Sequence, residues 1–167
     1  MKWMREFLSY ISIIVFVVVI RSYVITPVRV NGLSMYPNLT DGQLLLLEKI
    51  DRRYKRFDIV VIDYEEEGKK EKIIKRIIGL PGEHISYKNN TLYVNDQKIE
   101  ESFIDTKTSD IDISSLGSYT VPANTYFVLG DNRPVSKDSR YIGFIDKQDI
   151  DGKAIFSLFP FDAFGTI

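Results

Sequence analysis

The sequence contains no cysteine and a single histidine, and both scarcities exclude kinds of chemistry. Without cysteine among its 167 residues, the chain has no thiol nucleophile, disulfide or thiolate metal site. The absence says little about compartment, because many secreted proteins also lack disulfides. With His84 alone, a metal site would have to be built almost wholly from carboxylates, and a Ser-His-Asp triad would have one candidate imidazole.

The chain also lacks an excess of charge of either sign. Lys and Arg number 22 against 23 Asp and Glu, a net charge of -1, so no broad basic field is present to bind nucleic acid. No internal repeat or low-complexity tract is visible. The length fits one compact domain with room for a small inserted lobe. We therefore expect partners to be recognised locally and predict no nucleic-acid partner.

Long apolar runs are scarce, with one exception near the N-terminus. Residues 7–20 are apolar apart from Ser9 and Ser12, and the wider stretch 3–25 approaches the ~20 residues that cross a bilayer. The competing interpretations are a cleaved signal, a buried core helix and an interfacial helix. No Ala-x-Ala pattern follows the run, and apolar residues fall on every helical face. We therefore predict a transmembrane signal-anchor over residues 7–25.

The charges before this segment predict its orientation. Lys2 and Arg5 precede the apolar run, and the positive-inside rule places such residues in the cytoplasm. We expect residues 1–6 to be cytoplasmic and residues 26–167 to form an extracytoplasmic domain.

Beyond Pro27 the pattern changes to short β-branched runs separated by turn residues, which predicts a β-rich domain. The candidate strands are Val28–Val30, Leu44–Glu48, Ile59–Tyr64, Lys72–Ile78, Ile85–Lys88, Thr91–Val94, Tyr119–Val121, Tyr126–Leu129 and Gly152–Leu158. The charged, glycine-centred segment Glu65–Glu71 is typical of a hairpin tip. Residues Glu100–Gly117 show the least pattern, so we expect a loop without chemistry within a small β lobe at about 82–125.

Ser34 is the first candidate nucleophile, in Gly32-Leu33-Ser34-Met35-Tyr36-Pro37. A serine between glycine and proline is by itself ordinary turn chemistry. A serine hydroxyl becomes a nucleophile only when a neighbouring base removes its proton. His84 is one candidate base, although no orienting motif surrounds it, and lysine is the other established partner of serine.

Lys75 has the setting that a lysine base requires. It interrupts the apolar run Lys72-Ile73-Ile74-Lys75-Arg76-Ile77-Ile78-Gly79, and on a strand it would share a face with Ile73 and Ile77. Lowering a lysine pKa from about 10.4 to about 8 takes roughly 3 kcal/mol, which burial can supply. The alternative is an edge strand on which the lysine discourages aggregation.

Four ordered blocks resemble those of bacterial type I signal peptidase, in the short form of Gram-positive bacteria. They are Ser34–Pro37, Phe57–Val61, Lys75–Glu83 and Gly130–Arg140, the last being the most specific. The resemblance implies a mainly β fold, an antiparallel β catalytic domain of the signal peptidase and Ser-Lys repressor type behind one N-terminal transmembrane helix.

The resemblance also implies roles for individual residues. Ser34 would be the nucleophile and Lys75 the general base. Ser136 would orient the Lys75 amine, while Asp138 and Arg140 would form a supporting ion pair. No cofactor and no metal are implied.

The implied function is that of a membrane-bound serine endopeptidase that removes signal peptides from exported preproteins. Its partners would be preproteins with cleavable signal peptides, the lipid bilayer and a neighbouring secretion translocon. Small side chains would be preferred at the first and third positions before the cut.

Two departures and two rivals accompany this resemblance. Asn38 stands where the family usually has threonine, and Gly32 stands where some members have a serine that donates to the oxyanion. An alternative is a weak or inactive membrane-anchored paralogue that binds signal peptides. A self-cleaving Ser-Lys repressor is the other rival, but a hydrophobic segment occupies the place of its DNA-binding domain.

Overall fold

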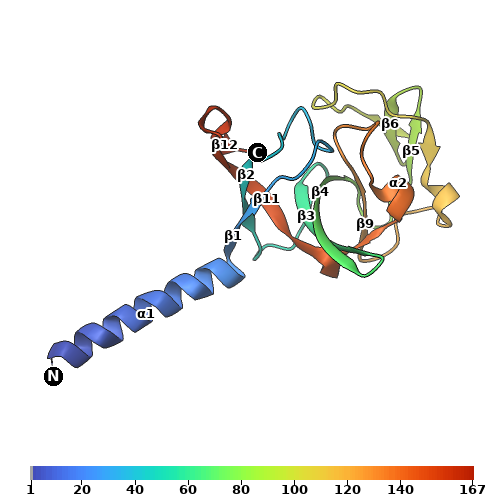
Figure 1. The fold of residues 1–167 in the computed structure, drawn as a ribbon. Coiled ribbons are helices and arrows are strands. Elements are labelled where there is room, and N and C mark those ends of the chain that lie inside the picture. The colour runs from blue at the N-terminus through green and yellow to red at the C-terminus, as the bar shows by residue number, and fades with distance from the viewer. Residues whose placement is uncertain (1) are drawn as a thin grey trace.

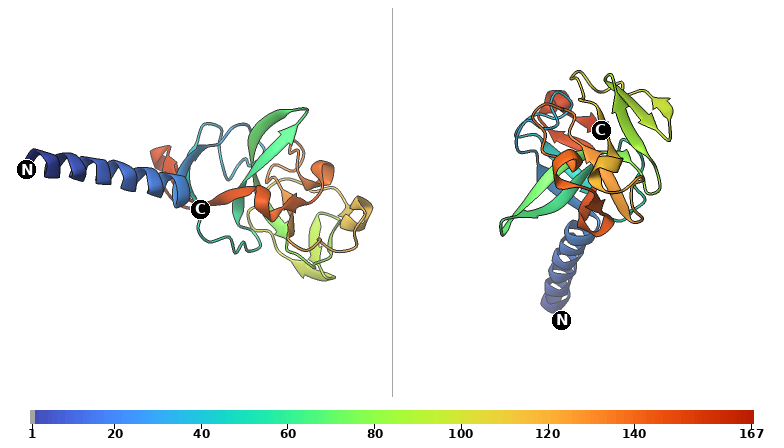
Figure 2. Two further views of the ribbon diagram at one scale, coloured as in Figure 1. Left: turned by 90° about the horizontal axis from the view of Figure 1, so that it is seen from below. Right: turned by 90° about the vertical axis from the view of Figure 1, so that its right-hand side faces the viewer.

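The structure is a computed structural model that describes residues 2–167, with the backbone alone for residues 2 and 19–23. A single long helix, α1 (Lys2–Tyr23), extends away from a compact body of β-sheets (Figures 1 and 2). Strand β1 (Ile25–Arg29) follows the helix directly and joins it to the body. The mainly antiparallel β fold predicted from the sequence is confirmed.

Helix α1 covers the segment for which we predicted a membrane span. Within the part of the chain that the structure describes, no helix is long and apolar enough to cross a membrane. The span predicted over residues 7–25 is therefore not supported. Ser9 and Ser12 interrupt the apolar run of residues 7–20, and Arg21 follows it.

The larger sheet forms the body of the domain and carries the nucleophile and base candidates. Its strands follow the order β1-β2-β11-β3-β4-β9-β10, with β12 paired to β11, and every pairing is antiparallel. The bounds are β2 Leu44–Glu48, β3 Ile59–Glu66, β4 Lys69–Gly79, β9 Thr125–Leu129, β10 Ile145–Asp146, β11 Ile150–Phe159 and β12 Gly165–Thr166. The predicted hairpin tip is confirmed, since β3 and β4 are joined through Glu67 and Gly68.

The middle of this sheet is buried on both faces, which explains the apolar run Ile59–Ile62 at the start of β3. Ile59 and Val61 pack into one core cluster, while Val60 and Ile62 pack into another on the opposite face. Alternate residues of a strand point to opposite faces, so a strand covered on both sides has no polar positions. A lysine on the neighbouring strand β4 is consequently removed from water.

A smaller sheet lies at the end of the body far from α1 (Figure 1). Its order is β7-β6-β5-β8, with β5 Ile85–Lys88, β6 Thr91–Val94, β7 Gln97–Ile99 and β8 Ile111–Asp112. A 3-10 helix, η1 (Ile113–Leu116), follows β8. Side chains of the smaller sheet and of η1 pack with the end of β4 and with β9 in a third core cluster, which includes Ile78, Tyr87 and Phe127.

Two sequence predictions in this region were wrong. The predicted strand Tyr119–Val121 is irregular, because Val121 exchanges backbone hydrogen bonds with Gly82 and Glu83 at an isolated point. The predicted loop Glu100–Gly117 contains β8 and η1. The remaining helices are short: α2 Ser139–Ile142, η2 Lys147–Asp149 and η3 Phe161–Ala163.

Candidate active site

Ser34 lies in a turn that is fixed by buried apolar neighbours. Met35 and Leu39 are each 1% exposed and belong to the core cluster that contains the β2 leucines. The Leu39 N–H donates to the Met35 carbonyl at 2.9 Å, which closes the turn. The turn thus presents Ser34 at the surface of the core.

The loop after β9 holds the backbone of the Ser34 turn from a second side. The Asn132 N–H donates to the Ser34 carbonyl at 2.9 Å, and Asn132 Nδ2 donates to the Leu33 carbonyl at 3.1 Å. Gly130 lies so close to this turn that a Cβ there would meet the Ser34 carbonyl at 2.5 Å and Ser136 Oγ at 2.2 Å. Only glycine fits at this position.

Lys75 reaches Ser34 from strand β4. The residue is 3% exposed, and its Nζ lies 2.9 Å from Ser34 Oγ and 3.0 Å from the Ile74 carbonyl. The structure therefore brings the two predicted residues into hydrogen-bond contact, although 41 positions separate them in the sequence.

The surroundings of Lys75 lower the pKa of its amine. Burial is the main cause and brings the pKa to about 8, against the opposing charges of Asp138, Glu71 and Asp131. Desolvation disfavours the ammonium form, so the neutral amine that a base requires is populated near neutral pH.

The predicted supporting residues gather beside the dyad of Ser34 and Lys75. Asp138 is fully buried and forms a two-point ion pair with Arg140, from Nε to Oδ1 at 2.8 Å and from Nη2 to Oδ2 at 2.9 Å. Asp138 Oδ2 also accepts from the Gly130 N–H at 3.0 Å. Ser136 is buried, and its Oγ has no hydrogen-bond partner within residues 2–167, so its contact with the Lys75 amine stays a prediction.

His84 lies in the smaller sheet region, away from the dyad's hydrogen bonds. Its ring stacks on Tyr119 with centroids 4.4 Å apart, and its Nε2 lies 3.0 Å from Asp112 Oδ1. The imidazole therefore contacts Tyr119 and Asp112, whereas Ser34 Oγ contacts Lys75.

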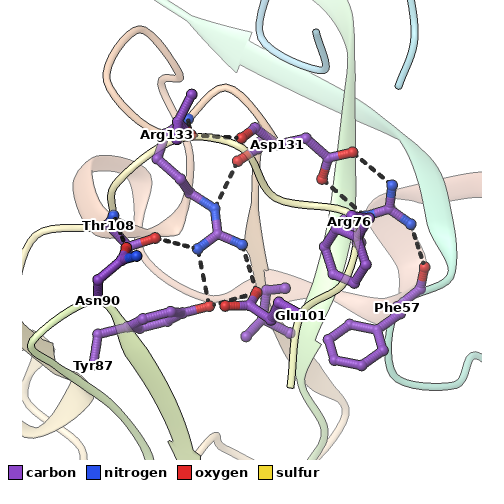
Figure 3. Close-up of polar contacts among 12 residues, drawn as sticks. Phe57, Arg76, Tyr87, Asn90, Glu101, Thr108, Asp131 and Arg133 are labelled. Carbon is purple, nitrogen blue, oxygen red and sulfur yellow. Dashed lines mark hydrogen bonds and ion pairs between the residues drawn. The ribbon is translucent and has the colours of Figure 1, made fainter. Parts of the chain in front are cut away.

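Sequence reasoning missed a chain of buried charged side chains, which Figure 3 shows. Arg76 pairs with Asp131 through two hydrogen bonds of 2.8 and 2.5 Å, and Arg133 pairs with Glu101 at 2.6 Å. Arg133 also donates to the Tyr87 hydroxyl at 3.1 Å. Arg76 on β4 and the loop residues Asp131 and Arg133 after β9 lie inside the blocks that resemble signal peptidase. Glu101 lies in the stretch to which we assigned no chemistry.

A groove of about 1060 Å³ opens at Ser34 and Lys75. One wall is formed by residues 26–29 and 31–34, and the other by residues 71–75 of β4. Asn132, Val135 and Lys137 border the groove from the loop after β9. Strand β4 pairs with β3 from Lys69 to Arg76 but with β9 only from Arg76 onward. One edge of residues 69–75 thus faces away from β3 without a neighbouring strand among the described residues.

This combination defines a class of protein. A serine hydroxyl in contact with a desolvated lysine amine, at the edge of an open groove, is typical of a serine hydrolase in which lysine replaces histidine as the base.

Comparison with known proteins gives the family. A family model described as "Signal peptidase, peptidase S26" matches residues 2–159. The chain is 37% identical to a signal peptidase I of Bacillus licheniformis, over 96% of this chain and 89% of that one. It is 34% identical to a signal peptidase I of Streptococcus pneumoniae serotype 4, over 99% of this chain and 97% of the other.

A solved structure agrees with these sequence matches. A crystal structure of a signal peptidase I from Enterococcus faecalis V583 superposes with a TM-score of 0.55 at 36% identity, covering 60% of this chain and 96% of that one. The chain therefore belongs to the signal peptidase family, peptidase S26, and is a serine endopeptidase that cleaves signal peptides.

Proposed function

We propose that Ser34 is the nucleophile and Lys75 the general base of this endopeptidase. The observation that carries the proposal is the 2.9 Å contact between Lys75 Nζ and Ser34 Oγ, two residues that line the groove. Burial holds the Lys75 pKa at about 8, so the free amine can accept the hydroxyl proton.

The reaction would then proceed in two halves. Ser34 Oγ attacks the scissile carbonyl while Lys75 Nζ takes its proton, and the resulting ammonium returns that proton to the departing amine. Water then attacks the acyl-serine ester, with Lys75 again as base, and frees the new carboxylate. In this scheme Ser136 orients the Lys75 amine, and Asp138 with Arg140 fixes the loop that carries Ser136.

The oxyanion would be stabilised by the backbone of the nucleophile turn. The Ser34 N–H donates to no acceptor among residues 2–167 and is free for this task. The Gly32 N–H is already engaged, because it donates to Asp41 Oδ1 at 2.7 Å. The second donor must therefore come from outside the backbone of Gly32.

The substrate would bind as an extended strand in the groove. The open edge of β4 at residues 69–75 can pair with a peptide backbone, as in β-strand addition. Half-buried Val28 lies on the facing wall, and Ile74 lines the β4 side of the groove. Such apolar walls would favour small side chains at the first and third positions before the cut.

Helix α1 would attach the enzyme to the lipid bilayer. Its apolar side chains between Trp3 and Val18 are exposed all round the helix, an arrangement that is stable in contact with lipid. By the positive-inside rule, Lys2 and Arg5 would keep the amino terminus cytoplasmic and the catalytic domain outside, next to the secretion translocon. Extraction of cell membranes with alkaline carbonate tests this attachment. Recovery of the full chain in the soluble fraction would argue against it.

The assignment of the dyad is tested by preprotein cleavage. Purified full-length protein is incubated with a preprotein that carries a cleavable signal peptide, and the variants Ser34→Ala and Lys75→Ala are compared with the original chain. Both should lose cleavage by several orders of magnitude. Undiminished cleavage by either variant would refute the dyad, and an inactive original chain would favour the signal-peptide-binding paralogue.

A further inference from the structure

The side chain of Asn38 connects three parts of the molecule that are distant in sequence. Its Nδ2 donates to Asp131 Oδ2 at 2.9 Å and to the Phe103 carbonyl at 2.8 Å. Asp131 lies in the loop after β9, and Phe103 lies between β7 and β8. Because the amide carries two protons, one side chain satisfies both acceptors.

These contacts close a ring of interactions around the dyad. Asn38 belongs to the same turn as Ser34, and its amide contacts Asp131. Asp131 accepts two hydrogen bonds from Arg76, which directly follows Lys75 on β4. Lys75 Nζ then returns to Ser34 Oγ at 2.9 Å.

The side chain of Phe103 covers the Arg76 guanidinium. Its ring lies over the Arg76 guanidinium at 4.1 Å from the centroid and packs edge-on against Phe57 at 4.9 Å. The contact with Asn38 fixes the backbone of Phe103 in this place. A cation beneath an aromatic face is shielded from water, which strengthens its pairing with Asp131.

We propose that Asn38 is a positioning residue that fixes the nucleophile turn relative to strand β4, and so the separation of Ser34 Oγ and Lys75 Nζ. The inference rests on the proposed roles of those two residues. Asn38 touches no reacting atom and acts through Asp131 and Arg76.

The residue type matters because a threonine cannot reproduce both contacts. A hydroxyl has one proton to donate, so Asn38→Thr can keep a donor for one of the two acceptors but not for both. Asn38→Ala removes both donors. The two variants therefore form a graded series in which the number of donors falls from two to none.

The test measures kcat and KM separately for peptide cleavage at a temperature well below each variant's melting midpoint. Asn38→Ala should lower kcat by about 10- to 100-fold with KM within about twofold, because misplacing a catalytic group by about 1 Å costs that much. Asn38→Thr should give an intermediate kcat. Gln148→Ala, which removes an exposed amide on η2, should leave both constants unchanged.

A kcat equal to that of the original chain in folded Asn38→Ala would overturn the inference, as would a raised KM with unchanged kcat. If Asn38→Ala does not fold, Asn38→Thr decides by the same criterion. Ser34→Ala is assayed alongside. Cleavage by Ser34→Ala would refute the proposed function itself, whereas an inactive Ser34→Ala beside a fully active Asn38→Ala would refute only the role of Asn38.

Discussion

The guanidinium of Arg76, the residue after Lys75 on β4, and the carboxylate of Asp131 form a two-point ion pair. Asp131 is 1% exposed and Arg76 is 9% exposed, so neither charge has much access to water. A buried pair of this kind adds little net stability over an apolar pair, but removing one partner leaves the other charge uncompensated. The pair therefore makes the fold dependent on both residues.

Asp131→Ala should destabilise the protein by about 3–5 kcal/mol, because Arg76 would remain buried without its carboxylate. The free energy of unfolding from urea titration measures this change. Asp51→Ala is the matched control, since it breaks an exposed pair with Arg53 and should leave the free energy of unfolding nearly unchanged. Equal effects of the two substitutions would contradict the account.

Lys75→Met should make the protein more stable at pH 7 while abolishing its activity. The Lys75 pKa is about 8 in the folded chain against 10.5 as the ordinary value, so the folded state binds its proton more weakly than the unfolded state. The resulting penalty is about 3 kcal/mol below pH 8, at about 1.4 kcal/mol for each pKa unit.

The sign of the pH dependence follows from the same comparison. Between pH 8 and 10.5 the unfolded chain keeps the proton that the folded chain has lost, so stability rises with pH as the penalty is relieved. The stability gained by Lys75→Met should accordingly shrink over this interval. Urea titrations at pH 7 and above pH 10 test this, and a variant less stable than the original chain at pH 7 would contradict it.

Gly130→Ala should abolish most of the activity, because the new methyl group would displace the Ser34 carbonyl or Ser136 Oγ, at 2.5 and 2.2 Å respectively. Gly152→Ala is a suitable comparison, since its methyl group would meet the Glu48 carbonyl at 2.7 Å, between strands β11 and β2, which carry neither Ser34 nor Lys75. Both variants should be less stable, but only Gly130→Ala should have a reduced kcat in its folded fraction. Peptide cleavage, corrected for the folded fraction by circular dichroism, separates them.

The longer strands could be predicted from the sequence pattern, whereas Ser34 and Lys75 were chosen as the candidate dyad only through the resemblance to signal peptidase. Strands such as β3 carry an unbroken β-branched run, and a lysine in such a run signals a buried charge. The short strands β7, β8, β10 and β12 could not be predicted, because two or three residues show no periodicity.

The role of Asn38 could not be predicted from sequence either. Its two partners lie 65 and 93 residues further along the chain, Phe103 between β7 and β8 of the smaller sheet and Asp131 after β9 of the larger one, so the folded chain alone brings them to Asn38. Glu101 was hidden for the same reason, since its partner Arg133 lies 32 positions away.

The pH dependence of kcat/KM tests the Ser34–Lys75 dyad most directly. If Lys75 must be neutral to act as base, kcat/KM should rise about tenfold for each pH unit in acid and level off above a midpoint near 8. The same midpoint should persist in His84→Gln. A midpoint near 6.5, the ordinary value for histidine, together with loss of activity in His84→Gln, would contradict the account.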